Sequence, residues 1–308
     1  MEKSLSIIIV SYNVSNLLNA CIASFYRHLN SEFEIIVVDN ASSDNTISLL
    51  RNNYPELIIV TNERNLGFTT ANNQGLSIAK GKMVLFLNPD TELRNGSINK
   101  FLENCINELP TTAIAGPKLL NADGSFQVST WKFPNAFNHF LELFFLHRLL
   151  NPSVYPEAFL TKKCNVDFIS GAAILLHRET AVKLNGFDEN LFWMEDVDLC
   201  IRNKDSGGIT QFFPDAEIIH YGGQSSKKNF NISIANQIIS KLKFYRKRKD
   251  LLNFLFSIPV FFLHIISRIL LFMLISPFNK VFFKKFLAYL FTIKKFFQFL
   301  FSGNINPT

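Results

Sequence analysis

The residues best suited to proton transfer are the acids of the segment Glu195-Asp196-Val197-Asp198, which opens a predicted helix. An aromatic-rich run, residues 186–194, comes directly before them. An apolar wall beside a carboxylate raises its pKa, and the raised pKa suits that carboxylate to act as a general base. Acids at the start of a helix are ordinarily partners of the helix dipole, so the catalytic interpretation depends on the aromatic-rich run that precedes them.

Polar side chains also follow four short apolar runs, at residues 5–10, 33–38, 57–60 and 83–87. In an open parallel sheet, ligands bind outside the carboxyl ends of the strands. We therefore expect the residues after these runs to meet in one crevice. They are Ser11-Tyr12-Asn13, Asp39-Asn40, Thr61-Asn62 and Asn88-Pro89-Asp90.

Three chain positions have both a functional and a structural interpretation. Asp39 either accepts a hydrogen bond from a nucleobase or a ribose hydroxyl, or caps the helix that follows. Asp90 fits a Mg²⁺ or Mn²⁺ ion bound mainly through substrate phosphates, but Asn-Pro-Asp is also a common turn. His220 ends a predicted strand before a Tyr-Gly-Gly turn, so it is either a metal ligand or a structural histidine.

Buried strands alternating with helical patterns must position these residues. The apolar runs are nearly continuous, which is typical of strands covered on both faces, and helical periodicity between them predicts βαβ units with a parallel sheet. Further elements are predicted at residues 113–115, 166–176, 196–203 and 217–220, with a short helix around Val182. The body of the chain is thus one α/β domain ending near Asn231.

Several classes of protein are excluded by missing motifs. The first strand-to-helix turn lacks G-x-G-x-x-G, and nothing matches G-x-x-x-x-G-K-[ST], which argues against a dinucleotide dehydrogenase and a P-loop NTPase. The four cysteines stand singly, without a C-x-x-C pair, and are interpreted as reduced core residues. The first residues lack a secretion signal, so we expect a cytosolic location for the catalytic body.

The net charge of +6 is unevenly distributed over the 308 residues. Residues 241–308 contain 12 Lys and Arg against one acid, Asp250, and 15 of the 33 phenylalanines. The remaining residues hold 19 of the 31 basic and 24 of the 25 acidic side chains, so the body carries −5 and the tail +11. A basic tail on an acidic body excludes a generic nucleic-acid binder and favours an anionic membrane surface as partner.

The composition changes abruptly near residue 250, and we predict two parts, residues 1–240 and residues 241–308. Residues 251–275 contain 18 Leu, Ile, Phe and Val, each worth about −0.3 to −0.6 kcal/mol in a membrane against about +3 for a central Arg. Basic flanks on both sides favour a hairpin or an in-plane helix over a single span. A polar stripe from Lys284 to Gln298 is consistent with a helix lying in the interface; the alternatives are a buried helical subdomain and a dimer interface.

The order of the motifs resembles the family 2 glycosyltransferases, most closely the bacterial rhamnosyltransferase-like members. The resemblance covers about residues 4–225. It is carried by SIIIVSYN, VVDNASSDNT, NERNLGFTTANNQG, FLNPDTEL, FISGAAILLHRE, GFDENLFWMEDVDLCIR and IIHYGG.

The resemblance implies a GT-A fold and an inverting transfer from a nucleotide-diphosphate sugar, a dTDP- or UDP-sugar, to a hydroxyl. It places Asp196 as the general base and Glu195 as its support at the acceptor. It implies a divalent Mg²⁺ or Mn²⁺ cofactor held by Asp90 and His220, although Asn88 replaces the first Asp of the family's D-x-D motif. The donor would be bound by Ser11, Tyr12, Asn13, Asp39, Arg64, Asn65, Gly67, Asn72, Asn88 and Asp90.

Two functions follow from these patterns. The first is a glycosyltransferase at the cytoplasmic face of the cell membrane that builds a cell-surface polysaccharide of O-antigen or capsule type on a lipid-linked saccharide, with rhamnose as one sugar it could transfer. The second is a catalytically silent subunit that binds sugar nucleotides or scaffolds a polysaccharide assembly complex, an alternative kept open by Asn88.

Overall fold

A computed structural model of the chain describes residues 4–144, 146, 153–222 and 230–302. Contacts divide the chain into two compact units. Unit 1 comprises residues 1–132, 154–189 and 195–222, and unit 2 comprises residues 133–153, 190–194 and 223–308. The predicted boundary at residue 240 lies inside a helix of unit 2, Phe230–Lys247.

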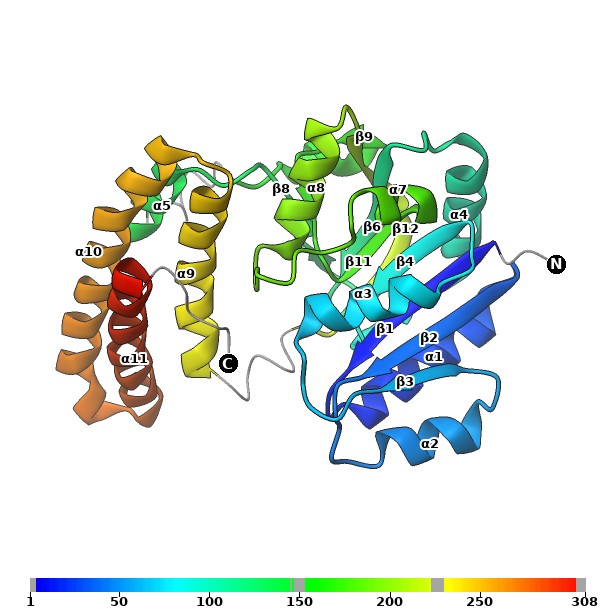
Figure 1. Cartoon of the computed structure of the whole chain (residues 1–308), viewed down its shortest axis with the longest axis horizontal. Coiled ribbons are helices and arrows are strands. Elements are labelled where there is room, and N and C mark those ends of the chain that lie inside the picture. Colours follow the sequence, from blue (N-terminus) through cyan, green and yellow to red (C-terminus); the bar gives the residue numbers. More distant parts are fainter. Residues whose placement is uncertain (1–3, 145, 147–152, 223–229, 303–308) are drawn as a thin grey trace. The chain divides into compact units, whose positions relative to one another are not determined.

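Unit 1 is built around a mixed sheet with the order β3-β2-β1-β4-β11-β6-β12-β5 (Figure 1). Its strands are β1 Leu5–Ser11, β2 Phe33–Asp39, β3 Ile58–Thr61, β4 Met83–Leu87, β5 Thr91–Leu93, β6 Ala113–Leu120, β11 Ala173–His177 and β12 Ile209–His220. Short strands β7 Phe126–Gln127 and β9 Cys164–Asn165 pair with β6 and β12, and β8 Thr130–Trp131 forms a separate ribbon with β10 Phe168–Ile169. The helical elements of unit 1 are α1 Ser15–His28, α2 Thr46–Asn53, α3 Phe68–Ile78, α4 Ser97–Glu108, η1 Glu157–Thr161, α7 Arg178–Lys183 and α8 Glu195–Asp205.

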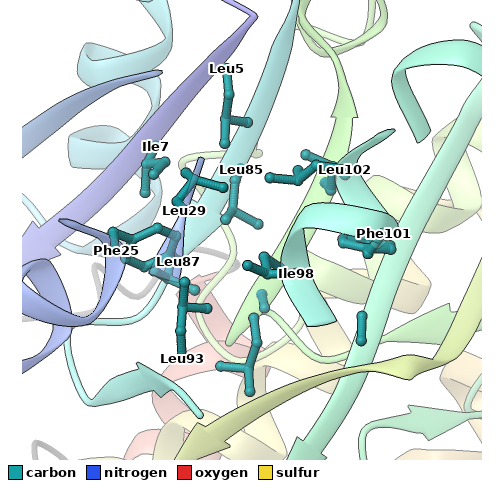
Figure 2. Packing of buried hydrophobic residues seen from close by; sticks show 14 of the residues in the cluster. Leu5, Ile7, Phe25, Leu29, Leu85, Leu87, Leu93, Ile98, Phe101 and Leu102 are labelled. Carbon is teal, nitrogen blue, oxygen red and sulfur yellow. The ribbon is translucent and has the colours of Figure 1, made fainter. Parts of the chain in front are cut away.

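The four early apolar runs form β1 to β4, which are mutually parallel as predicted. The side chains of β1, β2 and β4 alternate between two covered faces, whereas those of the edge strand β3 are half-buried or exposed. Ile7 and Ile9 of β1 join one core cluster with α1, α2 and α4, part of which is shown in Figure 2. Ile8 points to the opposite face, where a Cβ added to Gly75 of α3 would lie 2.4 Å from its Cγ2 atom. Burial on both faces explains why these runs lack the alternation of a half-exposed strand.

The sheet departs from a purely parallel one at β11, which runs antiparallel to both β4 and β6. The single run expected at residues 166–176 is therefore two strands, β10 and β11, separated by a turn. The strand predicted at residues 217–220 is the last part of the longer β12, which contains an irregularity between Phe213 and Glu217. Because β11 runs against its neighbours, its first residue meets the carboxyl end of β4: Ala173 pairs with Leu87.

Unit 2 is helical, with α5 Ala136–Leu143, α9 Phe230–Lys247, α10 Leu251–Ile275, η2 Ser276–Phe278 and α11 Lys280–Ser302. Helices α9, α10 and α11 share a core that includes Leu242, Ile265 and Phe296. Buried Arg268 of α10 donates to the carbonyl oxygens of Glu142 and Leu143, each at 3.4 Å, at the end of α5. A cation at the C-terminus of a helix compensates the helix dipole, which explains how this arginine is accommodated in an apolar helix.

The polar-stripe interpretation of the last helix is wrong in its central part. Ala288 and Thr292 of α11 are fully buried, and the Thr292 hydroxyl donates to the Ala288 carbonyl oxygen at 2.8 Å. These small side chains lie on the packed side of α11, whereas Lys284 is exposed. Within the described residues, α10 alone is long and apolar enough to cross a membrane, judged by length and composition.

Candidate active site

The carboxyl ends of the first parallel strands are joined by backbone hydrogen bonds that continue past the strands. Asn40 N donates to Ser11 O at 2.8 Å, and Asn62 N donates to Asp39 O at 2.9 Å. The polar residues predicted after β1, β2 and β3 therefore lie side by side at one edge of the sheet. This edge is the expected position of a ligand site in an open α/β sheet.

Asp39 is buried and organises the loop that follows β2. Its Oδ2 accepts from Ser42 N at 2.9 Å and its Oδ1 accepts from Ser42 Oγ at 2.5 Å. The loop is tied to Asn13, whose N–H donates to Ser42 Oγ at 2.9 Å and whose Oδ1 accepts from Ser43 N at 2.7 Å. Asp39 thus closes a turn; the α2 N-terminus is served by Asp44, which accepts from Thr46 N at 3.1 Å.

Two polar atoms of the predicted donor site are buried without a hydrogen bond to any other described residue. They are Ser11 Oγ at the end of β1 and Asn72 Oδ1 on α3, the helix that packs over β1 and β2. A buried polar atom without a partner is costly, so each is an open position for a ligand group. Tyr12, which follows Ser11 in the chain, is 43% exposed.

The loop before α3 carries the remaining predicted donor residues. Asn40 holds it, because its Nδ2 donates to Gly67 O at 3.1 Å and its Oδ1 accepts from Asn62 Nδ2 at 2.8 Å. Gly67 has a φ of +88°, a conformation that favours glycine, and its N–H donates to Asn65 Oδ1 at 2.9 Å. Arg64 and Asn65 are exposed. The organising role of Asn40 was not anticipated from the sequence.

Asp90 and His220 meet although 130 positions separate them. Oδ1 of Asp90 lies 3.4 Å from Nε2 of His220, and Nδ2 of Asn88 lies 3.4 Å from the same nitrogen. Pairing of β12 with β5, in register His220 with Thr91, produces this contact. Among the described residues, no group of three His, Cys, Asp or Glu side chains forms a metal cluster.

Gln127 contacts both the backbone and the ring of His220. Gln127 Nε2 donates to His220 O at 3.1 Å and to Asn121 Oδ1 at 2.9 Å, so its Oε1 faces His220 Nδ1 at 2.7 Å as an acceptor. Nδ1 therefore bears a hydrogen, and Nε2 faces the Asp90 carboxylate. Imidazole nitrogen and carboxylate oxygen are both ligands of divalent cations, so these residues fit a divalent ion.

Asp196 is held by two backbone N–H groups at the start of α8. Gly171 N donates to its Oδ2 at 3.0 Å and Val197 N donates to its Oδ1 at 2.8 Å. Burial raises the pKa of the Asp196 carboxyl from 3.8 to about 6, and the two N–H groups oppose the increase. The pKa is therefore close to the range that suits a general base at neutral pH.

The helix that carries Asp196 is anchored on its opposite side. Arg202 Nε donates to Asp198 Oδ2 at 2.6 Å, and its Nη2 donates to Gly186 O at 2.8 Å. Glu195, the first residue of α8, is half-buried. The aromatic-rich run before α8, residues 186–194, is divided between the two units. Phe187 packs in the core of unit 1 with its ring centroid 4.7 Å from that of Phe86, and residues 190–194 belong to unit 2.

One short loop contacts both Asp196 and Asn88, the neighbour of Asp90. Residues 170–172 lie between β10 and β11; Gly171 N holds Asp196, and Ala172 O accepts from Asn88 N at 2.9 Å. The sequence motif FISGAA included this loop without indicating its role. The sequence did not identify Gln127 as a site residue. Gln127 lies on β7, and only the pairing of β7 with β6 and of β6 with β12 brings it to His220.

Comparison with known proteins gives consistent matches. The family model "Glycosyl transferase family 2" matches residues 6–182. The N-acetylglucosaminyl-diphospho-decaprenol L-rhamnosyltransferase of Mycobacterium tuberculosis is 26% identical over 251 residues, covering 74% of this chain and 80% of the relative. The rhamnosyltransferase WbbL of Escherichia coli (strain K12) is 25% identical over 198 residues, covering 61% and 73%.

A solved structure is similar over almost the whole chain. It is the mannosyltransferase PcManGT from Pyrobaculum calidifontis in complex with GDP-Man and Mn²⁺, with a TM-score of 0.58 and 15% identity. The similarity covers 99% of this chain and 89% of that chain. At this identity the likeness concerns the fold.

The raised pKa of Asp196 predicts a pH-dependent effect of Asp196→Asn on stability. An unfolded aspartate has a pKa near 3.9, so the folded state binds the proton more tightly and loses stability as the pH rises from about 4 to about 6. The neutral Asn variant lacks this loss. The free energy of unfolding of the variant minus that of the wild type, measured by urea unfolding, should be about 2 kcal/mol larger at pH 7 than at pH 4. Asp215→Asn, at an exposed position of β12, is the control and should show no such increase.

Proposed function

The chain belongs to glycosyl transferase family 2 and has the GT-A fold, and from this premise we propose that it transfers a sugar with inversion from a nucleotide-diphosphate sugar to a hydroxyl of a lipid-linked saccharide. The observation that carries the proposal is the loop at residues 170–172. It connects the base-like carboxylate of Asp196 to Asn88, the neighbour of Asp90 and His220. A proton acceptor and a diphosphate site held by one loop can act on the two sides of one sugar.

The donor nucleotide is proposed to lie across the ends of β1 to β3. Ser11 Oγ and Asn72 Oδ1 are open acceptors there, and the loop held by Asp39 and Asn13 offers the rigid frame. Tyr12, exposed at the same edge, is available to cover the base. Arg64, Asn65 and Gly67, on the loop held by Asn40, complete this proposed donor site.

A Mg²⁺ or Mn²⁺ ion would be held by Asp90 and His220, with Asn88 beside them. When bound, such an ion supplies positive charge to the leaving diphosphate. Gln127 positions His220 for this task by accepting the Nδ1 hydrogen at 2.7 Å. Asn88 supplies an amide where the family's motif has a carboxylate, so the site has one negative charge fewer.

Asp196 is proposed to take the proton of the acceptor hydroxyl as its oxygen forms the bond to the anomeric carbon. The bond from that carbon to the diphosphate breaks on the opposite face, which inverts the configuration. One base suffices, because no covalent sugar intermediate forms, in contrast to the paired carboxylates of most glycosidases. Glu195 is proposed to bind acceptor hydroxyls beside Asp196.

The names of the relatives support the finer substrate assignments. Two are rhamnosyltransferases, and one acts on N-acetylglucosaminyl-diphospho-decaprenol. We therefore propose rhamnose as the sugar, a dTDP- or UDP-linked donor, and a polyprenyl-linked saccharide as the acceptor. A cell-surface polysaccharide of O-antigen or capsule type is the product class that this chemistry serves.

Unit 2 is proposed to hold the enzyme at the cytoplasmic face of the membrane. Leu251, Leu252 and Leu274 of α10 are 63%, 85% and 68% exposed, which leaves a broad apolar surface to be covered. Helix α11 packs on α10 and carries Lys284, Lys285, Lys294 and Lys295. Each lysine costs about 2.5–3.5 kcal/mol at a bilayer centre, so the helix pair is proposed to lie in the interface.

The alternative of a silent sugar-nucleotide-binding subunit is favoured by a single observation, Asn88 in place of an acid. Asp196→Asn separates the two functions. For an enzyme, the variant should lose about 10²–10⁴-fold in kcat while donor affinity, measured by calorimetry, stays within twofold. Asp215→Asn should keep full activity. Donor binding by the wild-type protein without turnover, across a panel of acceptors and metals, would support the silent subunit instead.

The metal assignment predicts graded effects on Mn²⁺ dependence. His220→Ala and Asp90→Asn should each raise the Mn²⁺ concentration for half-maximal transfer at least tenfold. Gln127→Leu should raise it about tenfold, because the imidazole loses its fixed orientation. Gln211→Leu, which removes a glutamine from an earlier part of β12, is the matched control. Unchanged Mn²⁺ dependence in all three site variants contradicts the assignment.

Membrane binding should depend on the exposed face of α10. The double variant Leu252→Glu/Leu255→Glu adds two charges at exposed positions and should reduce flotation with anionic vesicles at least tenfold. Ile78→Glu/Val182→Glu makes the same change at exposed positions of unit 1 and should float like wild type. Equal flotation of both double variants would show that this face of α10 is not the anchor.

A further inference from the structure

A pair of stacked aromatic rings lies on the β8–β10 ribbon of unit 1. Trp131 and Phe168 are direct cross-strand partners, and their ring centroids lie 5.4 Å apart with an interplanar angle of 19°. Both side chains are half-buried, so part of each ring remains accessible. No role in the mechanism above uses them.

The alternation of the ribbon makes this stack an outward-facing surface. The neighbouring pair, Thr130 and Ile169, points to the other face and is buried. Ile169 packs so tightly that a Cβ added to Gly116 would lie 2.7 Å from its Cδ1 atom. The inner face of the ribbon is therefore fixed to the sheet. The outer face carries the Trp131 and Phe168 rings stacked on each other, and Val154 pairs with Trp131 on the side away from Phe168.

The ribbon leads directly to Asp196. Ser170 N donates to Ser129 O at 2.9 Å, which continues the pairing, and the next residue, Gly171, donates to Asp196 Oδ2 at 3.0 Å. Gly171 is three positions after Phe168, and an extended chain covers at most about 10 Å over three positions. In Figure 1, β8 lies beside α8, and contacts between α8 and β10 confirm this proximity.

The position in the sheet distinguishes this surface from the donor site. The proposed nucleotide site lies on β1 to β3, on one side of β4, whereas the ribbon adjoins β12, on the other side of β4. Flat aromatic faces bind the apolar C–H face of a sugar ring, and the exposed edge leaves the ring hydroxyls in water. The ribbon thus brings an aromatic surface close in the fold to the helix that carries Asp196.

We propose that the Trp131–Phe168 stack is the platform on which a sugar ring of the acceptor saccharide lies, with one hydroxyl directed to Asp196. The inference rests on the proposed function and adds the residues that recognise the acceptor. Trp131 is a binding residue for the saccharide, and Phe168 supports its ring.

Kinetics test the platform in the full-length chain. Trp131→Ala should raise the acceptor KM at least tenfold, while the donor KM and the slow hydrolysis of the donor without acceptor stay within twofold. Trp131→Phe keeps a ring and should restore most of the affinity. Tyr26→Ala is the matched control, because Tyr26 is a partly exposed ring stacked on Tyr54 at 5.5 Å near the opposite edge of the sheet. An unchanged acceptor KM in folded Trp131→Ala overturns the proposal.

A binding experiment keeps the platform testable even where no transfer is observed. The chain has two tryptophans, so Trp193→Phe leaves Trp131 as the single indole fluorophore. Titration with a panel of methyl glycosides and disaccharides should change its emission saturably. The same titration of Trp131→Ala, in which Trp193 is the remaining indole and the sugar no longer binds, should give no saturable change. If no sugar alters the emission of Trp131, the platform is wrong. If a sugar does so but no donor is turned over, the platform stands and the proposed transfer fails.

Discussion

A carboxylate that has lost much of its water and is held by two N–H groups is the feature on which the proposed site depends. Burial raises the pKa of Asp196 to about 6, and the N–H groups of Gly171 and Val197 keep its ionised form attainable. Without burial the group would be too weak a base, and without the N–H groups its pKa would be higher still. The loop at residues 170–172 sets this balance, and it also binds the backbone of Asn88.

The antiparallel strand β11 explains how that loop reaches the site. In a purely parallel sheet, only strand ends arrive at the carboxyl edge. Because β11 runs in the opposite direction, it begins at this edge, and the turn before it lies against the end of β4. The start of α8 and the ends of β4 and β12 are thereby linked through this loop and Asn88. Arg202 holds α8 on its other side through Asp198 and Gly186.

Local patterns in the sequence were sufficient for the parallel half of the sheet and for the residues at its edge. Continuous apolar runs marked β1 to β4, and the polar residues after β1 to β3 lie side by side as predicted. Long-range pairing was not readable: Gln127 and Gly171 act through strands that meet only in the fold. The stripe on α11 was misjudged because Ala288 and Thr292 are small enough to pack between helices, a choice that periodicity alone does not reveal. Composition located the basic, apolar tail, but the helical unit also includes residues 133–153.

The pH dependence of transfer is the decisive measurement for the role of Asp196. The quantity to measure is kcat/KM of the wild-type chain between pH 4.5 and pH 8.5 at a saturating concentration of metal. If Asp196 is the base, activity falls with the uptake of one proton, with a midpoint close to the pKa of about 6 that burial gives Asp196. A rate that stays constant down to pH 4.5 would contradict Asp196 as the base.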